Sequence, residues 1–574
     1  MGELPINQFL NIAIMSTLPI SSAPFSSSSL PPVARNTVTS HPSIWGDQFL
    51  TYDEKEDFVI EKQLVEELKG EVRKMLMLKP FEPMQYVNMV KVIDVIQRLG
   101  LSYHFDGEIE DVLQHIYTTY GNNWIDEKNL ESVSLWFRLL RQQGFNVSSE
   151  TFKNHTEENG NFKETLCNDV QGMLALYEAA YMRVEGEQVL DEALEFTKTH
   201  LAIIAKDPSC DSLSRTEIQR ALNLPLRRTL PRLGAVGYIP IYQQQPTHNE
   251  VLLKLAKLDF NILQSMHKKE LSQLCKWWKD LDLGNRLPYV RDRCVEGYFW
   301  ILAIYFEPEH YRTRMFLLKT CMWLVVLDDT VDNYATYEEF EIFTQAVERW
   351  SISCLDMLPE YMKLIYQQLL NHHDEMEESL EKEGKAYQIH YVKEAAKDFV
   401  RSGLLEAKWL KEGYKPTLDE YISNASITIG QHVIIARSYV GRGDMVTEET
   451  FRWLATYPPL VKSSSLIFRL MDDLVTHQRE QERDHIPSCI ECYIKETGAS
   501  KEEACVFFAK QVEDAWKVIN RASLRPTDIP FSLLSPIINI SVIHVFYGGN
   551  DNYGHAGEEM IGYIKSLLVH PMVV

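Results

Sequence analysis

Cysteine and long apolar runs are both scarce in this sequence. Nine cysteines in 574 residues are too few for a disulfide framework. The one close pair, Cys489 and Cys492, has no second pair or flanking histidine to complete a zinc site. The longest apolar stretch, Met315 to Leu327, is interrupted by Lys319, whereas a membrane helix needs about 20 apolar residues. The sequence therefore predicts a protein of a reducing compartment without a membrane span.

Positive charge is also in short supply. The 81 acidic and 58 basic residues give a net charge of −23, which opposes binding to nucleic acid. An anionic ligand would need bridging cations or a local group of arginines. Residues 1–34 contain no Lys or Arg, whereas organellar transit peptides are typically Arg-rich. We therefore expect a flexible N-terminal extension at 1–34 and a cytoplasmic protein, with a plastid location less favoured; Met15 is an alternative start.

Sheet signals are nearly absent, because few alternating β-branched runs are bounded by hairpin turns. Apolar residues instead recur every three or four positions from about Phe58 onward, which is typical of amphipathic helices. The clearest helical segments lie near 85–99, 129–142, 170–182, 188–205, 250–279, 294–306, 314–334, 357–371, 386–410, 418–440 and 501–522. A polar stretch at 242–248 separates two helical blocks. We predict an all-α chain with domains at 35–245 and 246–574.

An acidic cluster follows the apolar run that ends at Leu327. Asp328 and Asp332 would lie one helical turn apart on the same face, with Asp329 beside them. Like charges at this spacing are destabilising, and a hydrophobic helix adds a desolvation cost. A hard divalent cation would turn this repulsion between carboxylates into attraction to the ion, because Mg²⁺ binds carboxylates and phosphate oxygens. A solvated acidic helix end is the alternative interpretation.

A second oxygen-rich stripe lies about 140 residues further on. Asp472, Thr476 and Glu480 fall at i, i+4 and i+8 of one helix, with Asp473 adjacent. An apolar segment again precedes the stripe. Two such helix faces could confront each other across a cavity and hold several cations between them.

Arginines and aromatic residues complete the constellation. Arg291 and Arg293 precede an aromatic-rich helix that contains Trp300, and Arg469 lies one turn before Asp472. Arginine suits forked recognition of phosphate oxygens, although pairing with the surplus carboxylates is an alternative. Aromatic side chains could line a pocket whose π faces stabilise a carbocation.

In this order, these pieces resemble the plant class I terpene synthases, and more closely the angiosperm sesquiterpene synthases. The segment from Asp328 to Asp332 looks like the family's DDxxD motif, and the segment from Asp472 to Glu480 looks like its second metal motif. The resemblance implies an N-terminal α-barrel-like domain without its own activity and a C-terminal catalytic α-bundle. It also implies small-molecule partners only, and we expect a monomer.

Carried over residue by residue, the resemblance implies three groups of site residues. Three Mg²⁺ ions, with Mn²⁺ as a substitute, would be bound by Asp328, Asp332, Asp472, Thr476 and Glu480, with Asp329 and Asp473 adjacent to the ligands. The substrate diphosphate would be held by Asp328, Asp332 and Asp472, through the metal ions, and by Arg291, Arg293 and Arg469. The pocket positions would be Trp300, Thr428, Tyr547, Asp551 and Tyr553. Thr428 to Gly430 matches a helix break whose carbonyls face the cation in relatives.

The expected reaction is Mg²⁺-dependent ionisation of (2E,6E)-farnesyl diphosphate, followed by cyclisation to a C15 hydrocarbon and release of diphosphate. Geranyl or geranylgeranyl diphosphate remains an alternative substrate. A chain-elongating prenyltransferase is a rival enzyme, but it normally shows two DDxxD motifs. An acidic helical scaffold is the rival outside enzymes. The sequence departs from the family at Arg35-Asn36, where tandem arginine marks plastidial monoterpene synthases, and at Gly234, Val236 and Gly237, where packing is in question.

Overall fold

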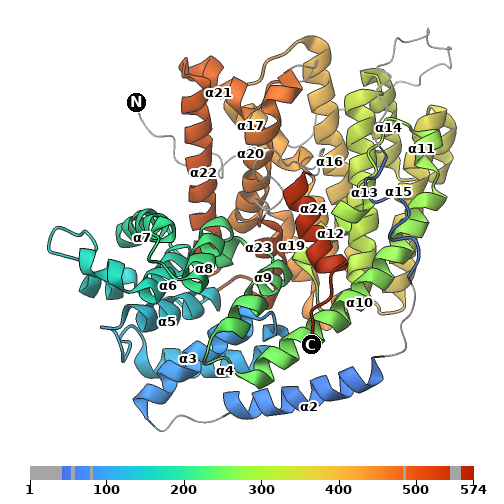
Figure 1. Cartoon of the computed structure of the whole chain (residues 1–574). Helices are drawn as coiled ribbons and strands as arrows, with labels where there is room; N and C mark the ends of the chain where they lie inside the picture. The colour runs from blue at the N-terminus through green and yellow to red at the C-terminus, as the bar shows by residue number, and fades with distance from the viewer. Residues whose placement is uncertain (1–41, 53–57, 78–81, 482–485, 543–556) are drawn as a thin grey trace. The chain divides into compact units, whose positions relative to one another are not determined.

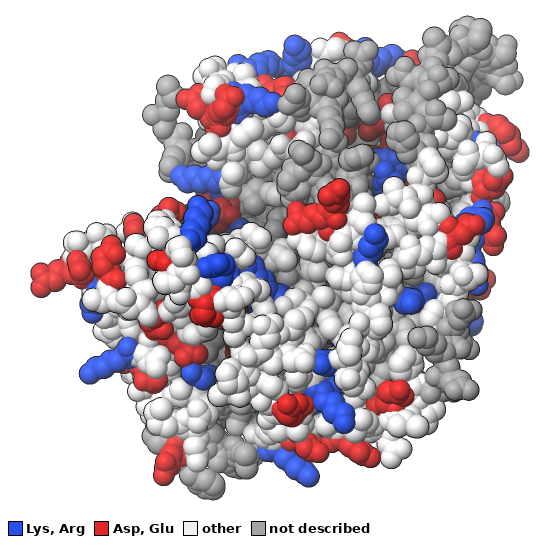
Figure 2. Space-filling model, in the orientation of Figure 1, with Lys and Arg blue, Asp and Glu red and all other residues white. Residues whose placement is uncertain are grey.

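The computed structural model describes residues 42–52, 58–77, 82–481, 486–542 and 557–574. In this part of the chain the regular structure is helical and no strand occurs; the one β-bridge joins Thr156 and Phe162. The all-α prediction is confirmed. No helix among these residues is both long and apolar enough to cross a membrane. On the face shown in Figure 2, basic side chains are scattered among acidic ones.

The described residues form two compact units, each drawn from separate stretches of the chain. Unit 1 comprises the described residues within 1–50, 273–298 and 312–515, and unit 2 those within 51–272, 299–311 and 516–574. Four described helices contribute to both units, namely α10 (Glu250–Asp280), α12 (Cys294–Ile304), α22 (Lys501–Ala522) and, by its first residue only, α13 (Tyr311–Asn333). After residue 51 the chain therefore passes from one unit to the other within helices.

Unit 2 is built around α5 (Leu130–Gln142), whose residues are buried on nearly every side. This helix contacts α3 (Pro83–Arg98) and α6 (Val170–Ala180), and α6 in turn contacts α7 (Gln188–Lys206). Its buried arginines have carboxylate partners, since Arg138 pairs with Asp94 and Arg141 pairs with Glu187. The remaining helices of this unit are α2 (Val59–Leu76), α4 (Asp106–Tyr120), α8 (Ser212–Asn223), α9 (Pro231–Gln244), α23 (Ser535–Ile540) and α24 (Glu558–Leu568).

Unit 1 is a helix group in which α16 (Tyr387–Glu412), α17 (Leu418–Thr428) and α20 (Pro459–Gln481) are neighbours (Figure 1). The group also contains α11 (Leu283–Arg286), α13 (Tyr311–Asn333), α14 (Tyr337–Arg349), α15 (Glu360–Glu381), α18 (Gln431–Ser438), α19 (Glu448–Ala455) and α21 (Cys489–Thr497). The break predicted at Thr428 to Gly430 is present, because α17 ends at Thr428 and Gly430 adopts a left-handed φ of 73° before α18 begins.

The departure from the family pattern at Gly237 has a structural counterpart within unit 2. A Cβ atom built on Gly237 would lie 2.1 Å from Nη1 of Arg220. The same guanidinium donates a hydrogen bond to the carbonyl oxygen of Gly234. Arg220 therefore fills the space beside these glycines, and a large side chain at position 237 would have to displace it.

Candidate metal centre

The first acidic cluster lies on the last turns of α13. Asp328 and Asp332 are both exposed, whereas the side chain of Asp329 is only 2% exposed. The two exposed carboxylates are one helical turn apart and so share a face, while Asp329 is rotated by about 100° into the protein. The two members of the Asp328–Asp329 pair therefore have different surroundings.

Arg291 binds both members of this pair. Its backbone N–H donates to Oδ2 of Asp329 at 2.7 Å, and its guanidinium contacts Oδ1 of Asp329 at 2.7 Å and Oδ2 of Asp328 at 3.0 Å. Burial raises the pKa of Asp329 to about 6, although the positive charge of Arg291 opposes the shift. Arg291, which the sequence predicts as a diphosphate ligand, thus lies beside the first cluster with Asp329 as its anchor.

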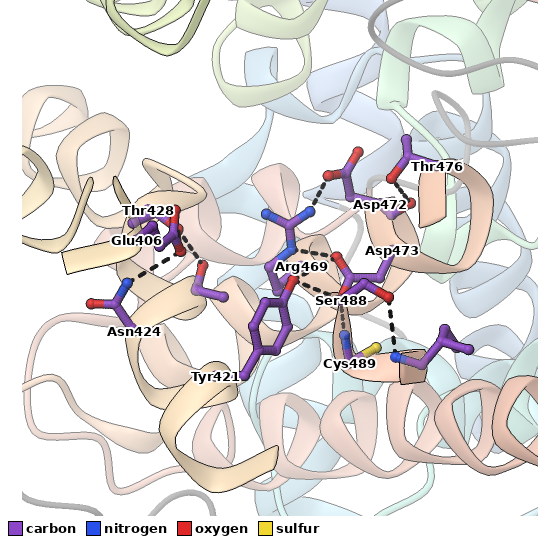
Figure 3. A network of polar contacts seen from close by, with 12 residues as sticks. Glu406, Tyr421, Asn424, Thr428, Arg469, Asp472, Asp473, Thr476, Ser488 and Cys489 are labelled. Carbon is purple, nitrogen blue, oxygen red and sulfur yellow. Dashed lines mark hydrogen bonds and ion pairs between the residues drawn. The ribbon is translucent and has the colours of Figure 1, made fainter. Parts of the chain in front are cut away.

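The second cluster on α20 repeats this arrangement (Figure 3). Arg469 donates from Nε to Oδ1 of Asp473 at 2.8 Å, and its Nη2 contacts Oδ2 of Asp472. Asp472 keeps 17% of its side-chain surface exposed, and Asp473 keeps none. Each Asp–Asp pair thus has one arginine bound to a buried aspartate and to an aspartate that solvent can reach.

Asp473 is the centre of a buried network. Its carboxylate accepts hydrogen bonds from the hydroxyl of Tyr421 at 2.9 and 3.0 Å and from the backbone N–H of Cys489 at 2.9 Å (Figure 3). These donors come from α17 and from the first residue of α21. Together with Arg469 they satisfy the buried charge, as a buried carboxylate requires.

Contacts with one shared neighbour show that α13 and α20 run in the same direction. Along α13, Thr313 donates to the carbonyl of Val440 at 3.0 Å, and Leu324 lies against Gly430. Along α20, Ser464 contacts Gln431 at 2.9 Å, and Asp473 binds Tyr421. Towards the C-terminal end of α13 and of α20, the contacted residues lie progressively closer to the N-terminal end of the α17–α18 pair. Both α13 and α20 are therefore antiparallel to that pair, and so parallel to each other.

Both acidic clusters therefore lie at the same end of the helix group in unit 1. Asp328 is one turn beyond Leu324, about 6 Å further along α13, and on the same stripe of that helix. Asp472 adjoins Asp473 at the level of Tyr421. The clusters lie on two parallel helices, on the same side of the α17–α18 break. This is the arrangement that a shared cation site needs.

A cavity of about 220 Å³ in unit 1 does not belong to this site. It lies against the face of α13 that contains Met322 and Val326. These residues are two positions from Leu324 and Asp328, which places them on the opposite side of the helix.

Several predicted residues have other contacts or lie outside the description. The hydroxyl of Thr428 donates to Glu406 at 2.7 Å, and that of Thr476 donates to the backbone carbonyl of Asp472 at 3.0 Å (Figure 3). Arg293 is buried, with Nη1 donating to the carbonyl of Asp292 at 2.9 Å. Trp300 is half-buried in unit 2. The side chain of Glu480 and all of Tyr547, Asp551 and Tyr553 lie outside the described residues.

Sequence reasoning missed Tyr421 and Glu406. Tyr421 is 52 positions from Asp473 in the chain, and no local pattern links them. Glu406 faces the end of α17, where it accepts hydrogen bonds from Asn424 at 3.2 Å and Thr428 at 2.7 Å. Only the packing of α16 and α20 against α17 brings these groups together.

Two family models match this chain. Residues 279–518 match the metal binding domain of the terpene synthase family, and residues 44–222 match the terpene synthase N-terminal domain. The chain belongs to the terpene synthase family. The predicted boundary at 245/246 falls between the two matched stretches and stays a prediction.

Similar terpene synthases cover nearly the whole chain. An (E)-beta-farnesene synthase of Artemisia annua is 63% identical over 98% of this chain and 100% of that protein. A sesquiterpene synthase of Xanthium strumarium is 50% identical over 94% of this chain and 99% of that protein. The resemblance to angiosperm sesquiterpene synthases is thus confirmed.

Solved terpene synthase structures share this fold. A limonene synthase bound to 2-fluorolinalyl diphosphate aligns with a TM-score of 0.88 at 31% identity, covering 94% of this chain and 100% of that chain. An isoprene synthase from grey poplar leaves, in complex with three Mg²⁺ ions and dimethylallyl-S-thiolodiphosphate, aligns with a TM-score of 0.84 at 31% identity, covering 92% and 99%.

Proposed function

We propose that this terpene synthase is a sesquiterpene synthase that ionises (2E,6E)-farnesyl diphosphate and releases diphosphate. The observation that carries the proposal is the placement of two Asp–Asp–Arg groups at one end of two parallel helices. Farnesyl diphosphate is favoured as the substrate because relatives at 63% and 50% identity are named for sesquiterpene products or for sesquiterpene synthesis.

The available donor atoms suit Mg²⁺. Asp328, Asp332 and Asp472 offer carboxylate oxygens, which hard divalent cations prefer. A carboxylate has about four lone-pair positions, so one guanidinium contact on Asp328 or Asp472 leaves capacity for a cation. We expect three Mg²⁺ ions, held by Asp328, Asp332, Asp472, Thr476 and Glu480, and Mn²⁺ as a substitute. The hydroxyl of Thr476 donates its hydrogen to the Asp472 carbonyl, so its oxygen lone pairs stay available to a cation.

When bound, Mg²⁺ would neutralise the negative charge that develops on the diphosphate as the allylic C–O bond breaks. Arg291 and Arg469 would add forked N–H donors to the same oxygens, and Arg293 is expected to join them. Asp329 and Asp473 position the first two arginines through buried ion pairs. Because these arginines are held in place before the C–O bond breaks, they would lower the barrier to ionisation without moving during the reaction.

The α17–α18 break would face the hydrocarbon part of the substrate. Among the described hydrogen bonds across the break, acceptors are the carbonyls of Ala425, Ile427 and Gly430, and none ends on the carbonyl of Thr428 or Ile429. Carbonyl oxygens outside the helical pattern present negative ends of dipoles, which suit a carbocation. Trp300, Tyr547, Asp551 and Tyr553 are expected to complete the pocket.

The proposed reaction can give either a cyclic or an acyclic C15 hydrocarbon. Cyclisation is the expected outcome, but the relative of Artemisia annua is named for (E)-beta-farnesene, an acyclic C15 hydrocarbon. Its 63% identity favours a second candidate in which the farnesyl cation loses a proton before any ring closes. Both outcomes share the ionisation step and differ only in the fate of the cation.

The proposal is tested by incubating the purified full chain with farnesyl, geranyl or geranylgeranyl diphosphate and Mg²⁺. Diphosphate release and gas chromatography with mass spectrometry identify the substrate and the product. We expect C15 hydrocarbon from farnesyl diphosphate alone and no activity after chelation, with recovery in Mg²⁺ or Mn²⁺. A requirement for isopentenyl diphosphate would indicate chain elongation instead. Failure with all three substrates would contradict the assignment.

Asp328→Asn is expected to reduce turnover by roughly 10²-fold or more, since metal contacts provide several kcal/mol of transition-state stabilisation. Asp356→Asn is the matched control, because Asp356 is an exposed aspartate of unit 1 outside both clusters. Equal activity of the two variants would favour the scaffold interpretation. The cytoplasmic location and the monomeric state are part of the proposal and are tested by fractionation and by light scattering.

A further inference from the structure

A group of three different metal-ligating side chains lies in unit 2, outside the candidate metal centre. One ligand atom each of Glu164, Cys167 and His200 lie within 4.8 Å of one another. Glu164 and Cys167 belong to the short 3₁₀ helix η3 (Glu164–Asn168), and His200 belongs to α7. Neither the acidic motifs nor the proposed reaction involves these residues.

The local geometry explains why the three side chains converge. In a 3₁₀ helix residues i and i+3 are eclipsed, so Glu164 and Cys167 project from the same side of η3. Sγ of Cys167 lies 4.0 Å from Oε2 of Glu164. His200 approaches from α7, where its ring lies 4.6 Å from that of Phe196, and Phe196 stacks on Phe162 at 5.6 Å. Aromatic packing thus restrains the imidazole.

Without a cation the arrangement disfavours the thiolate. Partial burial and the negative charge of Glu164 raise the pKa of Cys167, so the thiol stays protonated near neutral pH. A bound divalent cation would reverse this preference, because metal coordination takes the thiolate form and releases a proton to solvent. The carboxylate that opposes ionisation of the thiol would then be a second ligand of the same ion.

We propose that Glu164, Cys167 and His200 form a binding site for a transition-metal cation of the Zn²⁺ type. The set of one sulfur, one nitrogen and one oxygen donor suits Zn²⁺ or Co²⁺ and not Mg²⁺, which takes oxygen ligands. Three protein ligands with water in a fourth position make a common tetrahedral arrangement.

The site needs only a small adjustment to close around an ion. Zn²⁺ is bound at about 2.3 Å by sulfur and about 2.0–2.2 Å by nitrogen and oxygen, which places tetrahedral ligand atoms roughly 3.5 Å apart. The present spacing of up to 4.8 Å therefore closes by about 1 Å. Glu164 is exposed and the other two are half-buried, so small rotamer changes of the three side chains can supply the movement and an ion can enter from solvent.

The test is a Co²⁺ titration of the full chain under reducing conditions, with excess Mg²⁺ present to occupy oxygen-rich sites. We expect a thiolate-to-cobalt charge-transfer band in the near ultraviolet that saturates at one equivalent and is displaced by Zn²⁺. Cys167→Ser should abolish the band, and His200→Gln should weaken Co²⁺ binding at least tenfold. Cys210→Ser is the matched control, because Cys210 is another half-buried free cysteine of unit 2, and it should leave the band unchanged.

A second measurement needs no variant. Zn²⁺ should protect Cys167 from alkylation in the wild-type chain, and peptide mass spectrometry can compare this cysteine with Cys210. Absence of a charge-transfer band at millimolar Co²⁺, its persistence in Cys167→Ser, or equal alkylation of both cysteines with and without Zn²⁺ would overturn the proposal. Activity towards prenyl diphosphates has no part in these readouts, so the outcome is independent of the proposed function.

Discussion

At the scale of single residues, each Asp–Asp pair divides two tasks between its members. Asp328 is half-exposed and Asp329 is buried, and Asp472 keeps 17% of its side-chain surface exposed whereas Asp473 keeps none. The exposed member is available to a cation, while the buried member fixes an arginine. The sequence predicts that each pair lies on a helix, but burial depends on which neighbouring helix covers which side, and the sequence does not contain that information locally.

Replacing each member of the second pair by asparagine should separate these tasks. Asp473→Asn leaves Arg469 without its buried counter-charge and turns an amide N–H₂ towards other donors. We expect a loss of roughly 3–5 kcal/mol, as for other broken buried ion pairs, measured as a lower thermal unfolding midpoint. Asp472→Asn should lower the midpoint much less and yet abolish Mg²⁺-dependent diphosphate release. Equal destabilisation by the two substitutions would contradict the division of tasks.

Glu178 in unit 2 should make stability depend on pH. Burial raises the pKa of this carboxyl to about 7, and it accepts a hydrogen bond from the backbone N–H of Leu226 at 2.8 Å. The folded state holds the proton more tightly than the unfolded chain, so ionisation of Glu178 lowers the free energy of unfolding. This loss of stability is absent below about pH 4.5 and grows until about pH 7. Above about pH 7 the full loss in the free energy of unfolding is roughly 3 kcal/mol.

Glu178→Gln keeps an acceptor for Leu226 but cannot ionise. We expect the variant to unfold at a higher temperature than the wild type at pH 8 and at a similar temperature at pH 5. Scanning fluorimetry at both pH values measures the difference. Glu185→Gln is the control, because Glu185 is an exposed glutamate nearby in the chain. A stabilisation of Glu178→Gln that is the same at both pH values would exclude ionisation as its cause.

At the scale of elements, the α17–α18 break depends on Gly430. Its φ of 73° lies in the left-handed region, and a Cβ atom there would be 3.1 Å from Cδ1 of Leu324 on α13. Gly413, at the end of α16, also has a positive φ, of 62°, but a Cβ atom there would meet nothing within 4 Å. Both glycines therefore need a left-handed φ, but only Gly430 also lacks room for a Cβ atom.

Both Gly430→Ala and Gly413→Ala should lower the free energy of unfolding by about 1–2 kcal/mol, because alanine disfavours the left-handed conformation. Gly430→Ala should in addition push Leu324 and α13 away and reduce turnover, because Asp328 is one turn further along that helix. Steady-state kinetics and thermal unfolding of both variants measure the two effects. Comparable kinetics in the two variants would show that the contact with Leu324 does not position the first acidic cluster.

Helix positions could be predicted from the sequence where an apolar stripe was long. The segments at 250–279 and 501–522 correspond closely to α10 and α22, and the break inside 418–440 lies at the expected residues. The helices that were not predicted are α4, α8, α9, α11, α14, α19, α21, α23 and α24. α14 begins with a capping box between Thr336 and Glu339 and packs on α16. Its apolar residues Phe340, Phe343 and Val347 are buried, but its glutamates obscure this stripe in the sequence.

At the scale of the whole molecule, the fold class could be predicted and the connectivity of the units could not. A helix break does occur near 245, since α9 ends at Gln244 and α10 begins at Glu250. Unit 2 nevertheless includes residues from both sides of this break. Asp259 of α10 is buried and binds Tyr103 at 2.5 Å, His104 at 2.9 Å and Arg232 at 3.2 Å. Such long-range partners have no signature in local sequence.

Separating the chain at this break should therefore have opposite effects before and after folding. Expressed alone, residues 246–574 would leave Asp259 without these three partners, and we expect an insoluble product. A protease site inserted between Gln245 and Glu250 of the full chain should allow cleavage after folding. The two pieces should then co-elute in size-exclusion chromatography and retain activity. A soluble, cooperatively unfolding 246–574 fragment would instead support an autonomous domain.

The common direction of α13 and α20 also constrains the sequence in which ligands arrive. The C-terminal end of a helix has about half a unit of negative charge, and Asp332 and Glu480 fall in the last turns of these two helices. A bare pyrophosphate ester would meet repulsion from two helix ends as well as from the carboxylates. It should therefore associate only after, or together with, the cations. Calorimetry with a non-hydrolysable analogue should give no heat until Mg²⁺ is added.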